Sequence, residues 1–164
     1  SSAGLASTTF LAGAQFRRTA GVNITHVPYR SAPDAVTAVI RGDTQIYFVP
    51  VNLAKQQSET GKVRAIAAAT AQRIPDLPDV PTFTEAGVPF VYDSWFGLLA
   101  PAGTPKAITE KISRDWAEAL KTPEMKARMD AQFAIGQTDT PAAFDEIIRK
   151  ETESHTLAFK EAGN

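Results

Sequence analysis

The sequence predicts an α/β fold, in which a first half of alternating strands and helices precedes a second half of amphipathic helices. Two observations carry this prediction. Short apolar runs alternate with helical patterns up to about residue 70, which is typical of a parallel sheet with crossover helices. A Pro- and Gly-rich stretch over residues 76–105 then separates this part from a series of helix-start signals. We therefore expect two structural sections, residues 1–92 and 93–164.

The first half is predicted to alternate helix and strand in short steps. Helices are expected at residues 7–20, 31–41 and 52–59, and strands at residues 23–27, 44–49 and 63–69. Ser7 or Thr8 can cap the first helix and Gly21 can end it. Ser31 precedes a Pro in the first turn of the second helix, another common start signal. Strands joined by such helices give the βαβ arrangement.

Prolines dominate the middle of the chain. Pro75, Pro78, Pro81 and Pro89 exclude a long helix here, because proline fixes φ and lacks an N–H donor. Residues 95–100, WFGLLA, are as apolar as a buried strand. We expect Trp95 and Phe96 to pack in a core.

Three Thr-Pro pairs organise the second half. Each is expected to start a helix, the first from Thr104, the second from Thr122 to about Ala131, and the last from Thr140 to about Phe159. A short strand is predicted at residues 133–137. The first and last of these helices carry apolar stripes, formed by Ile108, Ile112, Trp116 and Ala119 and by Phe144, Ile147 and Ile148.

Composition limits the function classes. A net charge of −1 with no basic cluster argues against a nucleic-acid partner, and no window approaches the ~20 apolar residues of a membrane-spanning helix. The chain has no cysteine, and we expect no metal and no cofactor. The opening SSAGLAST lacks the features of a signal peptide and an initiator Met, so we expect a processed, tagged or cut chain.

Residues for catalysis are scarce. The only histidines are His26, within a predicted strand, and His155, on a helix four residues after Glu151. A structural role for His26 and a solvated helix face for His155 explain both better than a nucleophile–base pair. Asp76 and Asp79 flank Leu77-Pro78 at a spacing that suits turns rather than acid–base chemistry. We therefore expect a protein that is not an enzyme.

A candidate anion seat lies at the start of the first helix. Gly4, Ser7 and Thr8 belong to a small, hydroxyl-rich segment whose backbone N–H groups and helix dipole suit a carboxylate or phosphate. An ordinary N-cap is the alternative. Tyr29 and Arg30 follow a predicted strand, at the sheet edge where α/β proteins bind ligands. An exposed pair that serves only solubility is equally compatible with the pattern.

Several long segments resemble one family. They are SSAGLASTTFLAGAQF, THVPYRSAPDAVTAVIRGD, GKVRAIAAATAQRIPDLPDVPTFTEAGVP and DSWFGLLAPAGTPKAI, followed by the closing helix that ends in KEAG. The chain resembles the periplasmic substrate-binding receptors of tripartite tricarboxylate transporters, the Bug or TctC-like family. The similarity covers essentially the whole chain, but only the second half of the family's length.

The resemblance implies a two-lobed binding protein of the periplasmic-binding-protein type II kind. Residues 1–92 would form the second lobe, and residues 93–164 would supply the return crossing and closing helices of a first lobe that is otherwise missing. Carried over by position, the ligand seat falls on Ser2, Gly4, Ser7 and Thr8, with Tyr29 and Arg30 near the cleft. Thr9-Phe10 stands where Pro-His is common, and Phe48-Val49 where Phe-Asp is common. Without a carboxylate at Val49, a plain or more apolar organic acid is favoured over an amine-bearing one.

The function implied is capture of a small carboxylate in the periplasm and its delivery to the membrane components of a transporter. An α/β enzyme, such as a hydrolase or transferase, and a truncated module that binds weakly remain the alternatives. The apolar helix stripes also require cover. That cover would come from the missing N-terminal segment as a separate chain, from a second copy in a dimer, or from residues 1–92.

Overall fold

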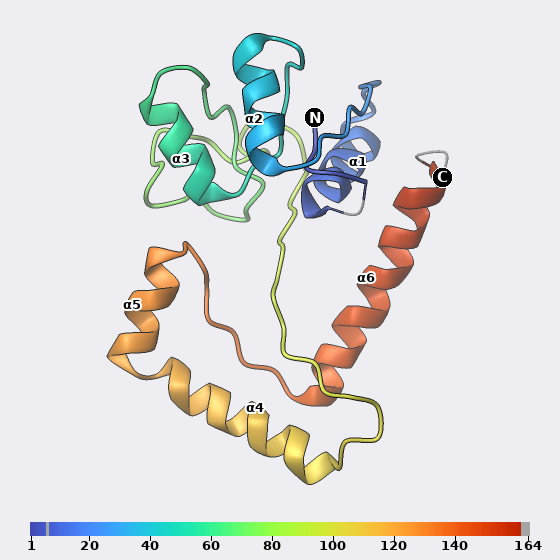
Figure 1. The fold of residues 1–164 in the computed structure, drawn as a ribbon, viewed down its shortest axis with the longest axis vertical. Coiled ribbons are helices and arrows are strands. Elements are labelled where there is room, and N and C mark those ends of the chain that lie inside the picture. Colours follow the sequence, from blue (N-terminus) through green and yellow to red (C-terminus); the bar gives the residue numbers. More distant parts are fainter. Residues whose placement is uncertain (6, 162–164) are drawn as a thin grey trace. The chain divides into compact units, whose positions relative to one another are not determined.

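The computed structural model describes residues 1–5 and 7–161 and divides them into two compact units (Figure 1). The first unit comprises Ser1–Trp95 and the second Phe96–Glu161. In sequence order the helices are α1 (Thr8–Ala20), α2 (Ala32–Arg41) and α3 (Val51–Glu59) in the first unit, and α4 (Lys106–Leu120), α5 (Pro123–Ala131) and α6 (Pro141–Glu161) in the second. All six of these helices were predicted from the sequence to within a few residues.

Local capping explains where the first two helices begin and end. The Phe10 N–H donates to Ser7 Oγ over 3.1 Å at the start of α1, and the Asp34 N–H donates to Ser31 Oγ over 3.3 Å in α2. Gly21 ends α1 in the left-handed conformation, at φ 65°. These caps satisfy backbone groups that a helix end leaves unpaired, and they are encoded within a few residues of each boundary.

The predicted strands of the first unit are extended segments that pair at only two points among the described residues. Ser2 bridges Pro28 and Ala68 bridges Thr82, both in the parallel sense. The first bridge joins segments on either side of α1, which is the βαβ connection expected. Ser1 Oγ also donates to the Ile46 carbonyl over 3.3 Å, so the segment at residues 44–49 contacts the first segment at Ile46. The order of segments is that of an α/β sheet, although residues 1–5 and 7–161 form no regular ladder.

Four phenylalanines form the centre of the first unit. Phe90 is fully buried, and its ring lies 5.5 Å from that of Phe16, 5.7 Å from Phe48 and 5.1 Å from Phe83, each edge-to-face. The four rings come from α1, from the segment before α3 and from both ends of the FTEAGVPF stretch. The Pro-rich region thus contributes directly to the core.

The turn after Pro81 is held by a reciprocal cap and an ion pair. The Thr82 N–H donates to Glu85 Oε2 over 2.7 Å, while the Glu85 N–H donates to Thr82 Oγ1 over 3.1 Å. Arg73 Nε donates to both Glu85 oxygens, and its Nη1 donates to the Pro78 carbonyl over 3.0 Å. These bonds tie the two ends of the Pro-rich loop together.

Acid should weaken this loop through Glu85. The Thr82 N–H and then Arg73 stabilise its carboxylate and lower the pKa of Glu85 below its usual 4.5. Because the folded pKa is depressed, the stabilisation is present above pH 4.5 and is lost as the pH falls through the lower value. We expect the urea midpoint to drop less between pH 5 and about pH 3 in Glu85→Gln than in the wild type. An equal drop in Glu85→Gln and in the exposed control Glu59→Gln would contradict this.

The second unit contains the three helices α4, α5 and α6, with α4 in contact with the other two. Helix α4 packs against α5 and α6. Trp116 Nε1 donates to the Gln137 carbonyl over 3.2 Å, and Ser113 Oγ donates to the Asp139 carbonyl over 2.9 Å. Neither α4 nor α5 contains a buried residue. The described part of this unit therefore has little core of its own.

Two expectations for the second half are wrong. Residues 133–137 do not form a strand, because Phe133 adopts φ 55° and closes α5 through the Ala134 N–H, which donates to the Met129 carbonyl over 3.0 Å. Trp95 and Phe96 are not packed in a core: they are 41% and 103% exposed. Leu98 and Leu99 are also exposed, at 69% and 76%. An apolar segment is buried only where neighbouring strands and helices cover it, and the described residues leave the large side chains of Phe96, Leu98 and Leu99 uncovered.

Among the described residues, no helix is both long and apolar enough to cross a membrane.

Candidate functional site

The candidate site is built where the first segment pairs with the segment before α2. The Ser2 N–H donates to the Val27 carbonyl over 3.2 Å, and the Tyr29 N–H donates to the Ser2 carbonyl over 3.0 Å. These bonds bring Ser2 and Gly4 next to Tyr29, although they lie far apart in sequence. Both α1 and α2 begin shortly after this pairing, so their N-termini follow the same edge.

Gly4 shapes the connection into α1. Its φ of +117° lies in a region that side chains other than glycine rarely adopt, and a Cβ there would meet the Tyr29 carbonyl at 3.8 Å. The turn that it makes aims the chain from the paired segment toward the first turn of α1. A glycine is therefore required for backbone conformation rather than for space.

Ser7 and Thr8 occupy the helix start differently. Ser7 is the N-cap: its Oγ accepts from the Phe10 N–H and donates to the Gly4 carbonyl over 2.7 Å. Thr8 follows as the first helical residue and is exposed. The capping interpretation of Ser7 is confirmed by these bonds, while a ligand contact by Ser7 or Thr8 remains a prediction.

Ser2 and His26 form a pair that sequence reasoning missed. Ser2 Oγ lies 2.6 Å from His26 Nε2, and the Ser2 side chain is completely buried. The same Oγ lies 3.2 Å from both the N and the O of Gly4. A serine beside an imidazole has the chemistry of a nucleophile–base pair, but this hydroxyl is sealed from solvent and already occupied by backbone partners. The alternation around His26 gave no indication of its distant partner.

Thr9 is a further polar residue near this pair, and it was not predicted to belong to the site. It is buried, its Oγ1 accepts from the Ala3 N–H over 3.0 Å, and it lies 2.8 Å from Ser7 Oγ. The neighbouring Tyr47 has a raised pKa because its hydroxyl is buried, an effect that Thr9 partly opposes. The hydroxyls of Ser7 and Thr9 thus lie together behind the start of α1.

Tyr29 and Arg30 lie at the entrance of α2. Tyr29 is half-buried and Arg30 is exposed. Arg30 places a permanent positive charge just before the N-terminus of α2, whose own dipole is positive at that end. This combination favours an anionic partner.

Val49, the last of the predicted ligand-site residues, lies just before α3. It is half-buried and lies directly before Pro50, the N-cap of α3. Within residues 1–5 and 7–95, no hydrogen bond or ring contact joins Val49 to the Ser2–Tyr29 pairing. Its place in the ligand site is still a prediction.

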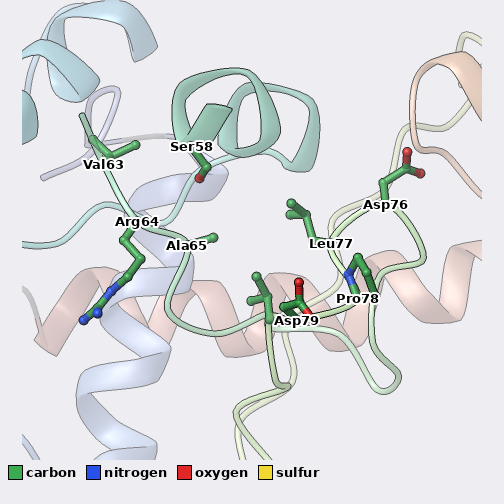
Figure 2. A pocket seen from close by; sticks show the side chains of 9 residues that line it. Ser58, Val63, Arg64, Ala65, Asp76, Leu77, Pro78 and Asp79 are labelled. Atoms are coloured by element: carbon green, nitrogen blue, oxygen red, sulfur yellow. The ribbon is translucent and has the colours of Figure 1, made fainter. Parts of the chain in front are cut away.

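A surface pocket of about 310 Å³ lies elsewhere in the first unit, between α3 and the Pro-rich loop (Figure 2). In Figure 2 the side chains of Ala65 and Leu77 face one another across it, while Asp76 points away. Asp76 is held instead by Lys55, whose Nζ lies 2.7 Å from Asp76 Oδ1. The pocket contains none of the residues predicted to bind a carboxylate, and the chemistry of the α1 start fits an anion better.

The pH dependence of stability should reveal the environment of His26. Burial, and then the positive charges of the amino terminus and Arg17, lower its pKa below 6.5. The unfolded chain therefore binds the proton more readily, so the contribution of His26 to stability is complete above pH 6.5 and declines as the pH falls below it. We expect the urea midpoint to fall between pH 7.5 and about pH 5.5 in the wild type and to change less in His26→Gln. Parallel profiles for the two proteins would show that another group titrates.

The described residues contain no group of acidic or histidine side chains placed to hold a metal ion. The candidate site therefore consists of backbone N–H groups, hydroxyls and one guanidinium. This set of donors binds and orients an anion without supplying a base or nucleophile.

Comparisons with known proteins agree on one family. The model of the "Tripartite tricarboxylate transporter family receptor" matches residues 1–144. A UPF0065 protein from the tcbD-tcbE intergenic region of Pseudomonas sp. (strain P51) is 31% identical over 154 residues, which are 93% of this chain and 46% of that protein. BugT of Bordetella pertussis is 28% identical over 149 residues, or 90% of this chain and 46% of BugT.

Solved structures show the same similarity. The R. palustris protein Rpa4515, determined with adipate, matches with a TM-score of 0.77 at 29% identity, over 96% of this chain and 53% of that one. MatC from Rhodopseudomonas palustris, determined with bound malate, matches with a TM-score of 0.71 at 29% identity, over 93% and 53%. These matches confirm the predicted α/β fold of the periplasmic-binding-protein type. The chain spans about half the length of each of these four proteins.

Proposed function

This chain belongs to the receptor family of the tripartite tricarboxylate transporters, and from that premise we propose that it captures a small organic acid in the periplasm for delivery to a membrane transporter. The family consists of receptors, not enzymes. The observation that carries the proposal is the edge where Ser2 pairs with Tyr29, because two helix N-termini and Arg30 present donors and positive charge there.

The class of ligand follows from the donors and from what the site lacks. Gly4, Ser7 and Thr8 would seat one carboxylate through backbone N–H groups and hydroxyls, and Tyr29 and Arg30 would hold a second polar group. Val49 offers no negative charge to an ammonium group, so a plain mono- or dicarboxylate fits better than an amino acid. Two neighbouring structures, with adipate and with malate, hold ligands of this kind.

A thermal-shift screen tests the proposal. A ligand that binds only the folded protein raises its melting temperature in a concentration-dependent way. We expect a shift with at least one acid in a panel of mono-, di- and tricarboxylates, and none with the corresponding amides or with sugars. Absence of any shift, supported by calorimetry at millimolar ligand, would leave the weakly binding module as the better description. Hydrolysis or group transfer by the protein would favour the enzyme alternative.

We further propose that residues 93–164 complete a lobe whose remaining elements come from another chain segment. The exposed apolar segment at residues 96–100 and the helices of the second unit support this, because large apolar side chains in water each cost about 1.5–3 kcal/mol relative to burial. The match to only about half the length of these relatives supports the same proposal.

Light scattering with intact mass spectrometry checks this second proposal. We expect a mass above 17.6 kDa, from a second copy or a companion chain. Leu99→Lys, which places a charge on the exposed apolar segment, should lower that mass, whereas Lys121→Glu on the exposed end of α4 should not. A monodisperse 17.6 kDa wild-type species would argue against the proposal.

A further inference from the structure

Two side chains from different elements, the buried Thr9 and the half-buried His26, hold the segment that leads into α1. Thr9 belongs to the first turn of α1, and His26 precedes the Pro28 bridge. Together they contact Ala3 and Ser2 directly, and they contact Gly4 through Ser2. The Oγ1 of Thr9 and the Nε2 of His26 are both engaged within the protein, by the Ala3 N–H and by Ser2 Oγ.

Thr9 fixes the middle of the segment. Its Oγ1 accepts the Ala3 N–H over 3.0 Å and lies 2.8 Å from the Oγ of Ser7, the N-cap. Because Thr9 is only 8% exposed, water does not readily replace this acceptor. Removing the hydroxyl would leave the Ala3 N–H without a partner, which costs more than the bond itself contributes.

His26 fixes both ends of the segment through one hydroxyl. Its Nε2 lies 2.6 Å from Ser2 Oγ, and that oxygen contacts the backbone N and O of Gly4 at 3.2 Å. The imidazole is itself held in place, because its centroid lies 4.8 Å from that of the Phe10 ring. Movement of His26 is thereby coupled to the backbone of Gly4, whose positive φ sets the direction of the chain.

We propose that Thr9 and His26 are positioning residues that hold the Ser2–Gly4 segment in the conformation that receives the carboxylate. This inference rests on the proposed function. Backbone donors bind an anion strongly only when they are already aimed at it, since ordering a loose loop upon binding reduces affinity. The two side chains provide that order from behind the seat, where they do not compete with the ligand.

Thr9 offers a matched pair of variants. Thr9→Val keeps the shape and removes the acceptor, whereas Thr9→Ser keeps the hydroxyl. We expect the Ala3 amide to exchange with solvent about tenfold faster in Thr9→Val, and the dissociation constant for adipate or malate, whichever the wild type binds, to rise about three- to tenfold. Thr9→Ser should behave as the wild type in both measurements.

His26 supplies an independent second test. His26→Phe preserves a ring against Phe10 but loses the bond to Ser2, while His26→Gln retains a polar nitrogen on a flexible side chain. We expect faster exchange at the Gly4 amide and weaker binding in His26→Phe, with partial recovery in His26→Gln. Both variants are compared at pH 7.5, where the wild-type imidazole is neutral.

The outcomes separate local positioning from general stability. Amides of α2 near Ala35 should exchange as in the wild type, and acceleration there in Thr9→Val and His26→Phe would assign both residues to global stability and overturn the proposal. Unchanged exchange at Ala3 and Gly4, or unchanged affinity despite faster exchange, would also overturn it. A wild type that binds neither acid counts against the proposed function for these acids, and the exchange comparison then decides by itself whether the two residues fix the segment.

Discussion

Phe90→Ala is expected to lower the free energy of unfolding of the first unit by about 3–5 kcal/mol, the range for removing a fully buried aromatic ring. Phe90 is inaccessible to solvent and meets three other rings edge-to-face. Its loss leaves a cavity and removes aromatic contacts beyond the area term. Since the rings come from three separate segments, the cavity cannot be closed by moving one of them. Urea unfolding followed by circular dichroism gives the change in midpoint and slope.

A neighbouring residue provides the control for Phe90. Val91 follows it directly but is 38% exposed, so Val91→Ala should cost well under half as much. A loss below about 1 kcal/mol in Phe90→Ala would contradict the assignment of the four-ring cluster as the core of this unit. Equal losses in the two variants would point to a backbone effect at this turn.

Arg30→Ala is expected to weaken binding of a dicarboxylate by about 1.5–3 kcal/mol, or roughly 10- to 150-fold, if the guanidinium meets the ligand as proposed. Arg30 is exposed at the start of α2, so its removal should leave folding intact. Arg30→Lys keeps the charge but not the paired donors, and should fall between the wild type and Arg30→Ala. Calorimetric titration of the acid identified by the thermal-shift screen supplies the dissociation constants.

The control for Arg30 removes the same charge at the other end of the helix. Arg41 lies in the last turn of α2, so Arg41→Ala changes the net charge equally without touching the proposed seat. A dissociation constant that is unchanged in Arg30→Ala would assign Arg30 to the solvated surface. Equal weakening in both variants would show that long-range charge, rather than contact, attracts the ligand.

The helices were predictable because their signals are local. Ser7 and Ser31 cap helices within the same few residues that they begin, and the Thr-Pro pairs at Thr122 and Thr140 do the same in the second unit. The family was likewise readable from long, idiosyncratic runs such as SWFGLLAPAGTP. Each of these features depends on residues adjacent in the chain.

The long-range contacts behind the candidate site could not be predicted from such local sequence signals. Ser2 contacts His26, and Phe16 contacts Phe90, only because the chain folds back between them. The sequence around one residue of such a pair does not identify the other residue. The apolar segment that contains Phe96 shows the opposite error, since its composition indicates burial while its surroundings leave its large side chains exposed.

By itself, then, the sequence determined the helices, the α/β class and the receptor family, because caps, periodicity and motifs act over short distances along the chain. Only the tertiary structure decided that Thr9 and His26 stand behind the Ser2–Gly4 segment, that four phenylalanines close the first core, and that residues 96–100 lack cover. Those outcomes depend on which distant atoms become neighbours. Burial and hydrogen bonding are properties of that arrangement, not of any residue taken singly.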